Sequence, residues 1–164
     1  VDLDAELQLK DGGKATPLMF IFRGRDEVIM RALLEKGADV NKLTRDHELG
    51  GEVTILHAAV ESVNQGYITP MRGLRVVELL LDFDAKVSIK NGRGQTALDI
   101  AKDKSFPKEL GGDEIVSILQ SAFDKEMKAF NRAAAKTRAQ EEKRKKQQAE
   151  LLKRDLPKPR RRKK

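Results

Sequence analysis

The two histidines, His47 and His57, are the side chains of this 164-residue chain best suited to acid–base or metal chemistry. An imidazole titrates near neutral pH and is the commonest metal ligand. A nucleophilic triad also needs a serine or cysteine and a carboxylate around the histidine, and no such arrangement accompanies either residue. The chain has no cysteine, which removes thiolate ligands, thiol nucleophiles and disulfides. The sequence therefore predicts no enzyme, no catalytic residue, no metal site, no cofactor and no small-molecule substrate.

Glycine pairs at residues 12–13, 50–51 and 111–112 are the next candidates, because glycine-rich loops can cradle phosphates. None has the spacing of a phosphate-binding loop between a strand and a helix. The adjacent acids Asp113 and Glu114 diverge on a helix, so they do not form an acid–base pair. Their negative charge instead favours the start of a helix.

Charge is divided unevenly along the chain. Residues 124–164 contain 17 Lys/Arg and six Asp/Glu, a net charge of +11, whereas residues 1–123 contain 16 and 20, a net charge of −4. This asymmetry is typical of a folded body followed by a charged arm. The arm is rich in good helix formers and predicts a solvated helix to about Arg154, stopped before Pro157. Its heptad pattern is too poor to predict a coiled coil.

The basic residues of the arm form two clusters. They are Lys143, Arg144, Lys145, Lys146, and then Lys158, Arg160, Arg161, Arg162, Lys163 and Lys164. Three interpretations remain open: a nuclear localisation signal that contacts importin, a polyanion-binding segment that contacts nucleic acid or a large assembly, and a simple solvated end. Aromatic side chains are absent from about the last thirty residues, which argues against recognition of bases by stacking.

Three segments of the acidic body repeat the same short motifs in the same order. A helix-start motif occurs as Thr16-Pro17-Leu18, as residues 54–59 (TILHAA) and as residues 96–101 (TALDIA). A repeat ending, LLEKGADVN, follows at residues 33–41, and a weaker version covers residues 80–88. Such self-similarity indicates stacked units that bury a shared core.

These motifs resemble the ankyrin repeat, and the resemblance covers about residues 1–123. It implies an all-α solenoid of helix–turn–helix units with hairpin fingers, followed by a long charged C-terminal helix. We expect repeats at about residues 12–44, 50–90 and 92–123, a charged helical extension at 124–156, and a disordered basic tail at 157–164. The first two residues, Val-Asp, fit the end of a truncated preceding repeat.

Local signals agree with this organisation. Thr16 can cap a helix that Pro17 begins. Apolar residues at helical spacing predict the buried faces of the second helices; they are Val28, Ile29, Ala32, Leu33, then Val76, Val77, Leu80, Leu81, then Ile115, Val116, Leu119. The residues expected to close the end of the stack are Ile115, Ile118, Leu119, Ala122 and Phe123.

Three segments are longer than the pattern requires. The interval from the capping threonine to the paired leucines is 17 residues in the first unit, 26 in the second and 23 in the third. The additional residues are expected between the two helices of a repeat, at 62–74 and 104–112. The finger between Asn41 and Thr54 is also enlarged, since its interval is 13 residues where the pattern expects eight.

The resemblance implies a protein-binding scaffold whose concave face is built from fingers and first helices. The residues expected on this surface are Arg23, Lys42, Arg45, His47, Glu61, Tyr67, Arg72, Lys90, Arg93 and Lys102. His57, at the T-P-L-H position, is expected to be structural. Tyr67 is interpreted either as a contact residue or as packed on the helices. The bulky segment 20–22 is interpreted either as core or as an exposed apolar groove.

Three functions remain as hypotheses: a scaffold or adaptor for a protein of unknown identity, anchoring on nucleic acid or a large assembly through the arm, and a docking or regulatory segment of a larger protein. No apolar run reaches the roughly 20 residues of a membrane-spanning helix, so no membrane insertion is expected. The nucleus or the cytoplasm is the expected location.

Overall fold

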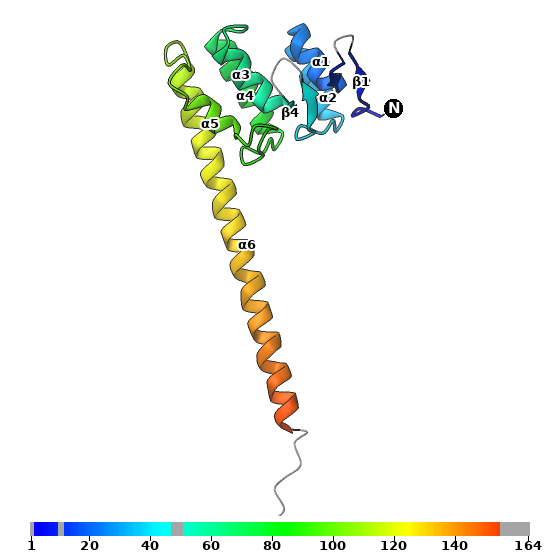
Figure 1. The fold of residues 1–164 in the computed structure, drawn as a ribbon, viewed down its shortest axis with the longest axis vertical. Coiled ribbons are helices and arrows are strands. Elements are labelled where there is room, and N and C mark those ends of the chain that lie inside the picture. The colour runs from blue at the N-terminus through cyan, green and yellow to red at the C-terminus, as the bar shows by residue number, and fades with distance from the viewer. Residues whose placement is uncertain (1, 10–11, 47–50, 155–164) are drawn as a thin grey trace, which may run out of the picture. The chain divides into compact units, whose positions relative to one another are not determined.

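A computed structural model describes residues 2–9, 12–46 and 51–154, and the chain divides into two units, Val1–Glu126 and Met127–Lys164. The first unit holds helices in successive pairs, with α1 against α2 and α3 against α4 (Figure 1). The first helices stack on one another, because α3 contacts both α1 and α5. The helix bounds are α1 Pro17–Gly24, α2 Glu27–Glu35, α3 Ile55–Asn64, α4 Pro70–Asp82, α5 Ala97–Ala101 and α6 Gly112–Arg154.

This arrangement confirms the predicted all-α stack of helix–turn–helix units with hairpins and a long charged C-terminal helix. The predicted basic tail at 157–164 lies outside the described residues.

Threonine side chains begin four of the helices. Each caps its helix by accepting a hydrogen bond from the backbone N–H three residues later, which satisfies a donor that has no partner within the helix. The pairs are Thr16 with Met19, Thr54 with His57, Thr69 with Arg72, and Thr96 with Asp99. The repeated threonine seen in the sequence is therefore a set of helix caps in the same position of each unit.

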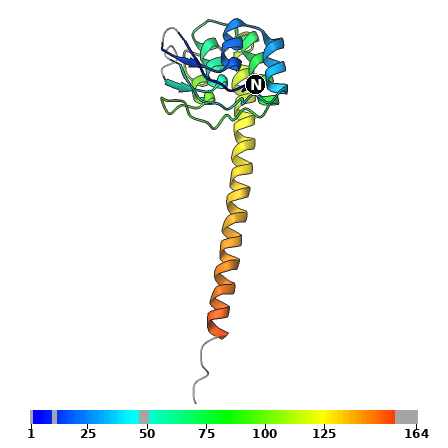
Figure 2. The same cartoon turned by 90° about the vertical axis from the view of Figure 1, so that its right-hand side faces the viewer.

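Two antiparallel hairpins lie beside the helices. Strands β1 (Leu7–Gln8) and β2 (Lys14–Ala15) pair Leu7 with Ala15, and β3 (Thr44–Asp46) and β4 (Gly51–Val53) pair Thr44 with Val53. Strand β2 contacts β3, and Figure 2 shows both hairpins on the same side of the first unit. The finger expected between Asn41 and Thr54 is therefore a hairpin.

The additional residues of the second unit do not form the long loop expected at 62–74. They lengthen the helices, since α3 has 10 residues and α4 has 13, against eight and nine in α1 and α2. Only residues 65–69 separate α3 from α4, because Thr69 and Pro70 supply a cap and a first helical residue early. In the third unit, by contrast, residues 102–111 between α5 and α6 are non-helical, as predicted.

The core is continuous through the stack and ends on α6. Val76, Val77 and Leu80 of α4 are fully buried, and so are Ile115 and Leu119 of α6, which close the stack as predicted. These apolar faces cover one another because a single repeat cannot bury its own hydrophobic face.

The buried face of α2 differs from the expected one. Val28 is 80% exposed and Ile29 45% exposed, whereas Met30 and Leu34 are buried. Residues four apart lie on one face of a helix, so α2 packs against α1 through Met30 and Leu34 and turns Val28 outward. Helical spacing indicated an amphipathic helix but did not select which apolar residues face inward.

The carboxylate of Glu126 ties α6 to the turn that follows α4. Its two oxygens accept hydrogen bonds from the backbone N–H groups of Val87 at 2.7 Å and Ser88 at 3.1 Å. Both bonds join a charged acceptor to main-chain donors, which makes them stronger than neutral hydrogen bonds.

We expect Glu126→Ala to lower the free energy of unfolding by about 1–3 kcal/mol, because two backbone donors lose a charged acceptor. Glu126→Gln should cost less, since its amide oxygen can still accept one of the bonds. Urea denaturation measures both changes, with Glu150→Ala in the exposed part of α6 as the control. Equal losses in Glu126→Ala and Glu150→Ala would contradict the role of Glu126.

Candidate functional site

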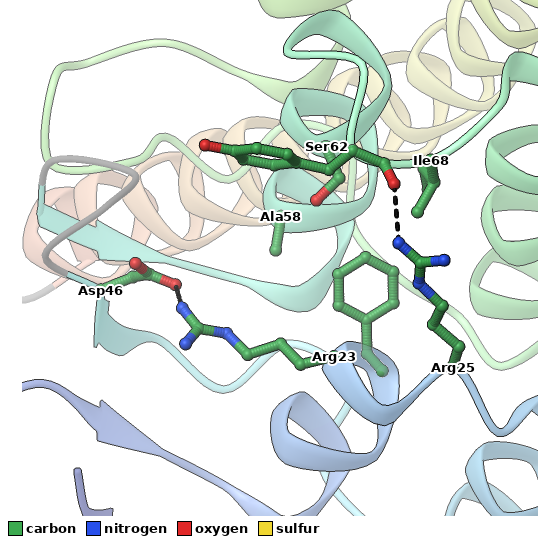
Figure 3. A pocket seen from close by; sticks show the side chains of 8 residues that line it. Arg23, Arg25, Asp46, Ala58, Ser62 and Ile68 are labelled. Carbon is green, nitrogen blue, oxygen red and sulfur yellow. Dashed lines mark hydrogen bonds and ion pairs between the residues drawn. The ribbon is translucent and has the colours of Figure 1, made fainter. Parts of the chain in front are cut away.

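A hollow of about 270 Å³ opens between α1 and α3, and we call it the α1–α3 hollow (Figure 3). Helix α1, its following turn, strand β3, helix α3 and the α3–α4 loop all contribute to its wall. The lining residues are Phe22, Arg23, Arg25, Asp46, Ala58, Ser62, Tyr67 and Ile68.

Small side chains on α3 create the space. Ala58 and Ser62 are four residues apart, so they lie on one face of α3, and both are buried. Phe22 of α1, which is 5% exposed, supplies an aromatic wall, and Ile68 adds an aliphatic one. The inner wall is therefore mainly apolar, as in ligand and peptide pockets generally.

A buried carboxylate orients one of the two arginines at the hollow. Arg23 donates from Nη2 to Oδ2 of Asp46 at 2.6 Å, and the Asp46 side chain is 3% exposed, against 34% for Arg23. Asp46 ends β3, where the alternating exposure of Thr44, Arg45 and Asp46 turns it inward. A buried carboxylate needs such a partner, because an unpaired buried charge is strongly unfavourable.

The second arginine joins the first repeat to the second. Nη2 of Arg25 donates to the backbone carbonyl of Tyr67 at 3.0 Å, across 42 residues of sequence. Arg25 is the C-cap of α1 and has the left-handed conformation, with φ of 64°. Tyr67 is 59% exposed, so the structure differs from the interpretation in which Tyr67 packs on the helices.

The bulky segment 20–22 was interpreted either as core or as an exposed apolar groove, and each interpretation fits part of it. Phe22 is buried and lines the α1–α3 hollow, Ile21 is partly buried, and Phe20 is 54% exposed. The three consecutive residues point in different directions because each step along a helix turns by about 100°.

Of the residues predicted for the binding surface, Arg23 and Tyr67 meet at the α1–α3 hollow. Glu61 and Arg93 come together elsewhere, at a small cleft beside His57. Four others lie in neither place: Lys42, Arg45, Lys90 and Lys102. His47 lies outside the described residues, as do Lys158 to Lys164 of the basic tail. Lys143 to Lys146 are exposed on α6.

Arg72 was expected on the binding surface but is largely covered. Its side chain is 18% exposed, and its Nε lies 3.6 Å from Oε1 of Glu27, at the start of α2. The pair links α4 of the second repeat to α2 of the first. Its place is explained by the short α3–α4 loop, which puts Arg72 inside the first turn of α4.

His57 holds two repeats together through both ring nitrogens. Nδ1 accepts from the Thr54 hydroxyl at 2.8 Å and from the Thr54 backbone N–H at 3.3 Å, and Nε2 donates to the Gln95 carbonyl at 3.1 Å. The residue is 1% exposed, and burial lowers the pKa of its imidazole, which stays neutral. This geometry uses every polar atom of the ring, and it supports the expected structural role.

A backbone contact joins the enlarged finger to the turn of the next unit. The Gly92 N–H donates to the Glu52 carbonyl at 2.7 Å. A Cβ atom at Gly92 would lie 2.9 Å from the backbone nitrogen of Glu52, so only glycine fits this approach. Strand β4 is thereby held against the turn that precedes α5.

Sequence reasoning missed Arg25, Asp46 and Ser62. The inward position of Asp46 has a weak signal in the two-residue alternation of the finger. Arg25 and Ser62 have none, because their roles depend on how two repeats stack. Within the described ranges, no group of three or more His, Cys, Asp or Glu side chains is placed to hold a metal ion, and no helix is long and apolar enough to cross a membrane.

Comparison with known proteins identifies the repeat. The sequence model of the ankyrin repeat matches residues 14–45, which include α1, α2 and the start of β3. Among solved structures, the ankyrin repeat domain of human ASB11 is similar, with 22% identity and a TM-score of 0.46 over 73% of this chain. This chain spans 43% of the length of that ASB11 chain. No curated protein sequence matches it.

Proposed function

We propose that this chain, which is an ankyrin-repeat protein, binds a protein partner through the first helices of its repeats and its hairpins. The α1–α3 hollow anchors one side chain of that partner. The ankyrin repeat is a non-catalytic interaction fold, and its framework leaves specificity to variable surface residues. The single observation that carries the proposal is the α1–α3 hollow, which is lined by an apolar wall and by two arginines, Arg23 and Arg25.

The residues that line the hollow suggest the kind of side chain that it accepts. Phe22, Ala58 and Ile68 offer apolar contact, and the exposed ring of Tyr67 stands at the rim. Tyrosine and arginine are enriched among residues that dominate binding energy at interfaces. An apolar anchor residue in the partner would therefore fill the hollow beside Tyr67.

Charge suggests what should flank that anchor. Two arginines, Arg23 and Arg25, line the hollow with one carboxylate, that of Asp46, which already pairs with Arg23. The local excess is one positive charge, carried by the guanidinium of Arg25, which donates to the neutral carbonyl of Tyr67. We infer that the partner segment places an Asp or Glu next to its apolar anchor, since guanidinium groups bind carboxylates with charge-assisted hydrogen bonds.

Selection from a phage-displayed random peptide library on the full chain tests this proposal. Enriched peptides should contain an apolar residue beside an acidic one. Tyr67→Ala and Arg25→Asn should each lower the affinity for the selected peptides by about tenfold or more, as expected at an interface hot spot. Asparagine is chosen at residue 25 because it tolerates the left-handed conformation.

The matched control is Arg75→Gln, which removes an arginine from the outer groove between α2 and α4. Its affinity for the selected peptides should stay within about twofold of the unaltered chain, measured by isothermal titration calorimetry. The proposal fails if Arg75→Gln weakens binding as much as Arg25→Asn, or if neither Tyr67→Ala nor Arg25→Asn has an effect.

A further inference from the structure

The second unit carries a row of positive charges on the exposed part of α6, and the proposed function does not involve them. Lys128, Arg132, Lys136, Lys143 and Lys146 are all exposed and are separated by four, four, seven and three residues. Steps of three, four and seven residues return to the same face of a helix. These five cations therefore form one basic stripe, about 27 Å long at 1.5 Å per residue.

Acidic residues interrupt this stripe only at its edges. Glu142 lies beside Lys146, and Glu150 ends the stripe four residues beyond it. Glu141 lies on a different face, about 140° or more from Lys136 and Lys143 at 100° per residue. Among the described side chains, none of the five cations has a salt bridge or a side-chain hydrogen bond. Five like charges held in a line attract a polyanion.

We propose that the basic stripe binds the phosphate backbone of a nucleic-acid duplex without reading its sequence. A duplex is a rod with charges at regular intervals, and a straight helix with a line of cations complements such a rod. The major groove of B-form DNA is about 12 Å wide and admits an α-helix. A duplex carries one phosphate charge per about 1.7 Å of its axis, so phosphates lie along the whole length of a stripe of about 27 Å.

Other occupants fit the stripe less well. A single strand is usually held by bases stacked on aromatic rings, and the described part of α6 after Met127 has one aromatic residue, Phe130, which lies away from the stripe. An interfacial membrane helix needs an apolar face, and the exposed large apolar side chains of this segment are Phe130 and Leu151, 21 residues apart. The proposal is independent of the α1–α3 hollow, which belongs to the other unit.

Two triple variants of the full chain provide the test, because they remove the same charge from different faces. The stripe variant carries Lys128→Gln, Arg132→Gln and Lys136→Gln. The control variant carries Arg138→Gln, Arg144→Gln and Lys145→Gln, none of which belongs to the stripe. Glutamine preserves helix propensity, and circular dichroism verifies the helix in both.

The measurement is the affinity for a 24-base-pair DNA duplex and a matched RNA duplex by fluorescence anisotropy at several salt concentrations. Each phosphate contact adds roughly −0.9 to the slope of log K against log salt. The stripe variant should reduce the magnitude of that slope by about 2–3 and weaken binding at low salt more than tenfold, whereas the control should change the slope by less than 1. The DNA and RNA arms distinguish the two sources of the same phosphate chemistry.

Three results would overturn the proposal. In the first, the unaltered chain fails to bind either duplex at low salt. In the second, both triple variants reduce the slope of log K against log salt by the same amount, which would mean that net charge alone attracts the duplex. In the third, polyglutamate or a single strand of equal charge competes as well as the duplex, which would identify an acidic protein surface or a flexible polyanion instead.

Discussion

Replacing Gly112 by alanine should lower the free energy of unfolding by about 3 kcal/mol, the upper end of the range expected when a substitution forces packed backbone to move. A Cβ atom at Gly112 would overlap the carbonyl oxygen of Pro107 and lie 2.7 Å from its carbonyl carbon. Both are main-chain atoms, so no side chain can rotate out of the way. Gly112 begins α6, and the 102–111 loop folds tightly over that first turn.

The consequence extends beyond one contact because α6 closes the stack. Ile115 and Leu119, in the first two turns of α6, are fully buried. A shift of the helix start would also move these side chains out of the core. We therefore expect Gly112→Ala to lower the denaturation midpoint of the whole first unit in a single transition.

Gly24→Ala is the matched control, since Gly24 is also helical and a Cβ atom there would have nothing within 4 Å of it. Alanine favours helices over glycine by about 0.5–1 kcal/mol, so the control should be neutral or slightly stabilising. Urea denaturation followed by circular dichroism measures both variants. If Gly112→Ala lost less than about 0.5 kcal/mol, the Pro107 carbonyl would have to move freely, contrary to this packing.

The second large effect concerns His57. We expect His57→Ala to cost about 2–4 kcal/mol, because it removes two sets of hydrogen bonds and leaves a cavity at a site that is 1% exposed. The loss should appear in the stacking of the second repeat on the third, since Nε2 bonds to Gln95. Thermal or urea denaturation measures it.

Stability should also depend on pH through this residue. Burial lowers the pKa of His57 in the folded chain, whereas the unfolded chain has the ordinary value of about 6.5. Above that pH the imidazole is neutral in both states and adds nothing to the pH dependence of stability. As the pH falls below about 6.5, the unfolded state takes up the proton first, so stability decreases by at most about 1.4 kcal/mol per pH unit. A proton on Nδ1 would also face the donor N–H of Thr54.

His57→Gln removes this titration and should flatten the stability profile between about pH 7.5 and 5, the range around the ordinary histidine pKa. The matched control is His47→Gln, because His47 and His57 are the only histidines in the chain. Carboxylates such as Asp99, whose pKa is lowered by hydrogen bonds from Thr96, lose their contribution at lower pH and do not obscure this range. A profile that flattens with His47→Gln and not with His57→Gln would contradict the assignment.

The sequence alone determined the elements whose signals are local. Threonine before a helical segment marks a cap because its side chain reaches the third N–H, and Thr16, Thr54 and Thr96 all do so. Helix formers without apolar periodicity predicted the long charged helix, which α6 confirms. The structural role of His57 was also predicted, from the resemblance of residues 54–59 to the first-helix motif of the ankyrin repeat.

Only the tertiary structure decided which surface is hollowed and which residues meet there. Arg25 and Tyr67 are 42 residues apart, and their contact depends on how far α1 and α3 stand from each other. On α3 the hollow is lined by Ala58 and Ser62, whose small size is ordinary for a helix core and gives no signal in the sequence. Arg72 was expected on the binding surface, and it is covered because α4 begins early. Local patterns define elements through backbone hydrogen bonds and helix caps, whereas a site between repeats depends on packing, which is known only once the helices are in contact.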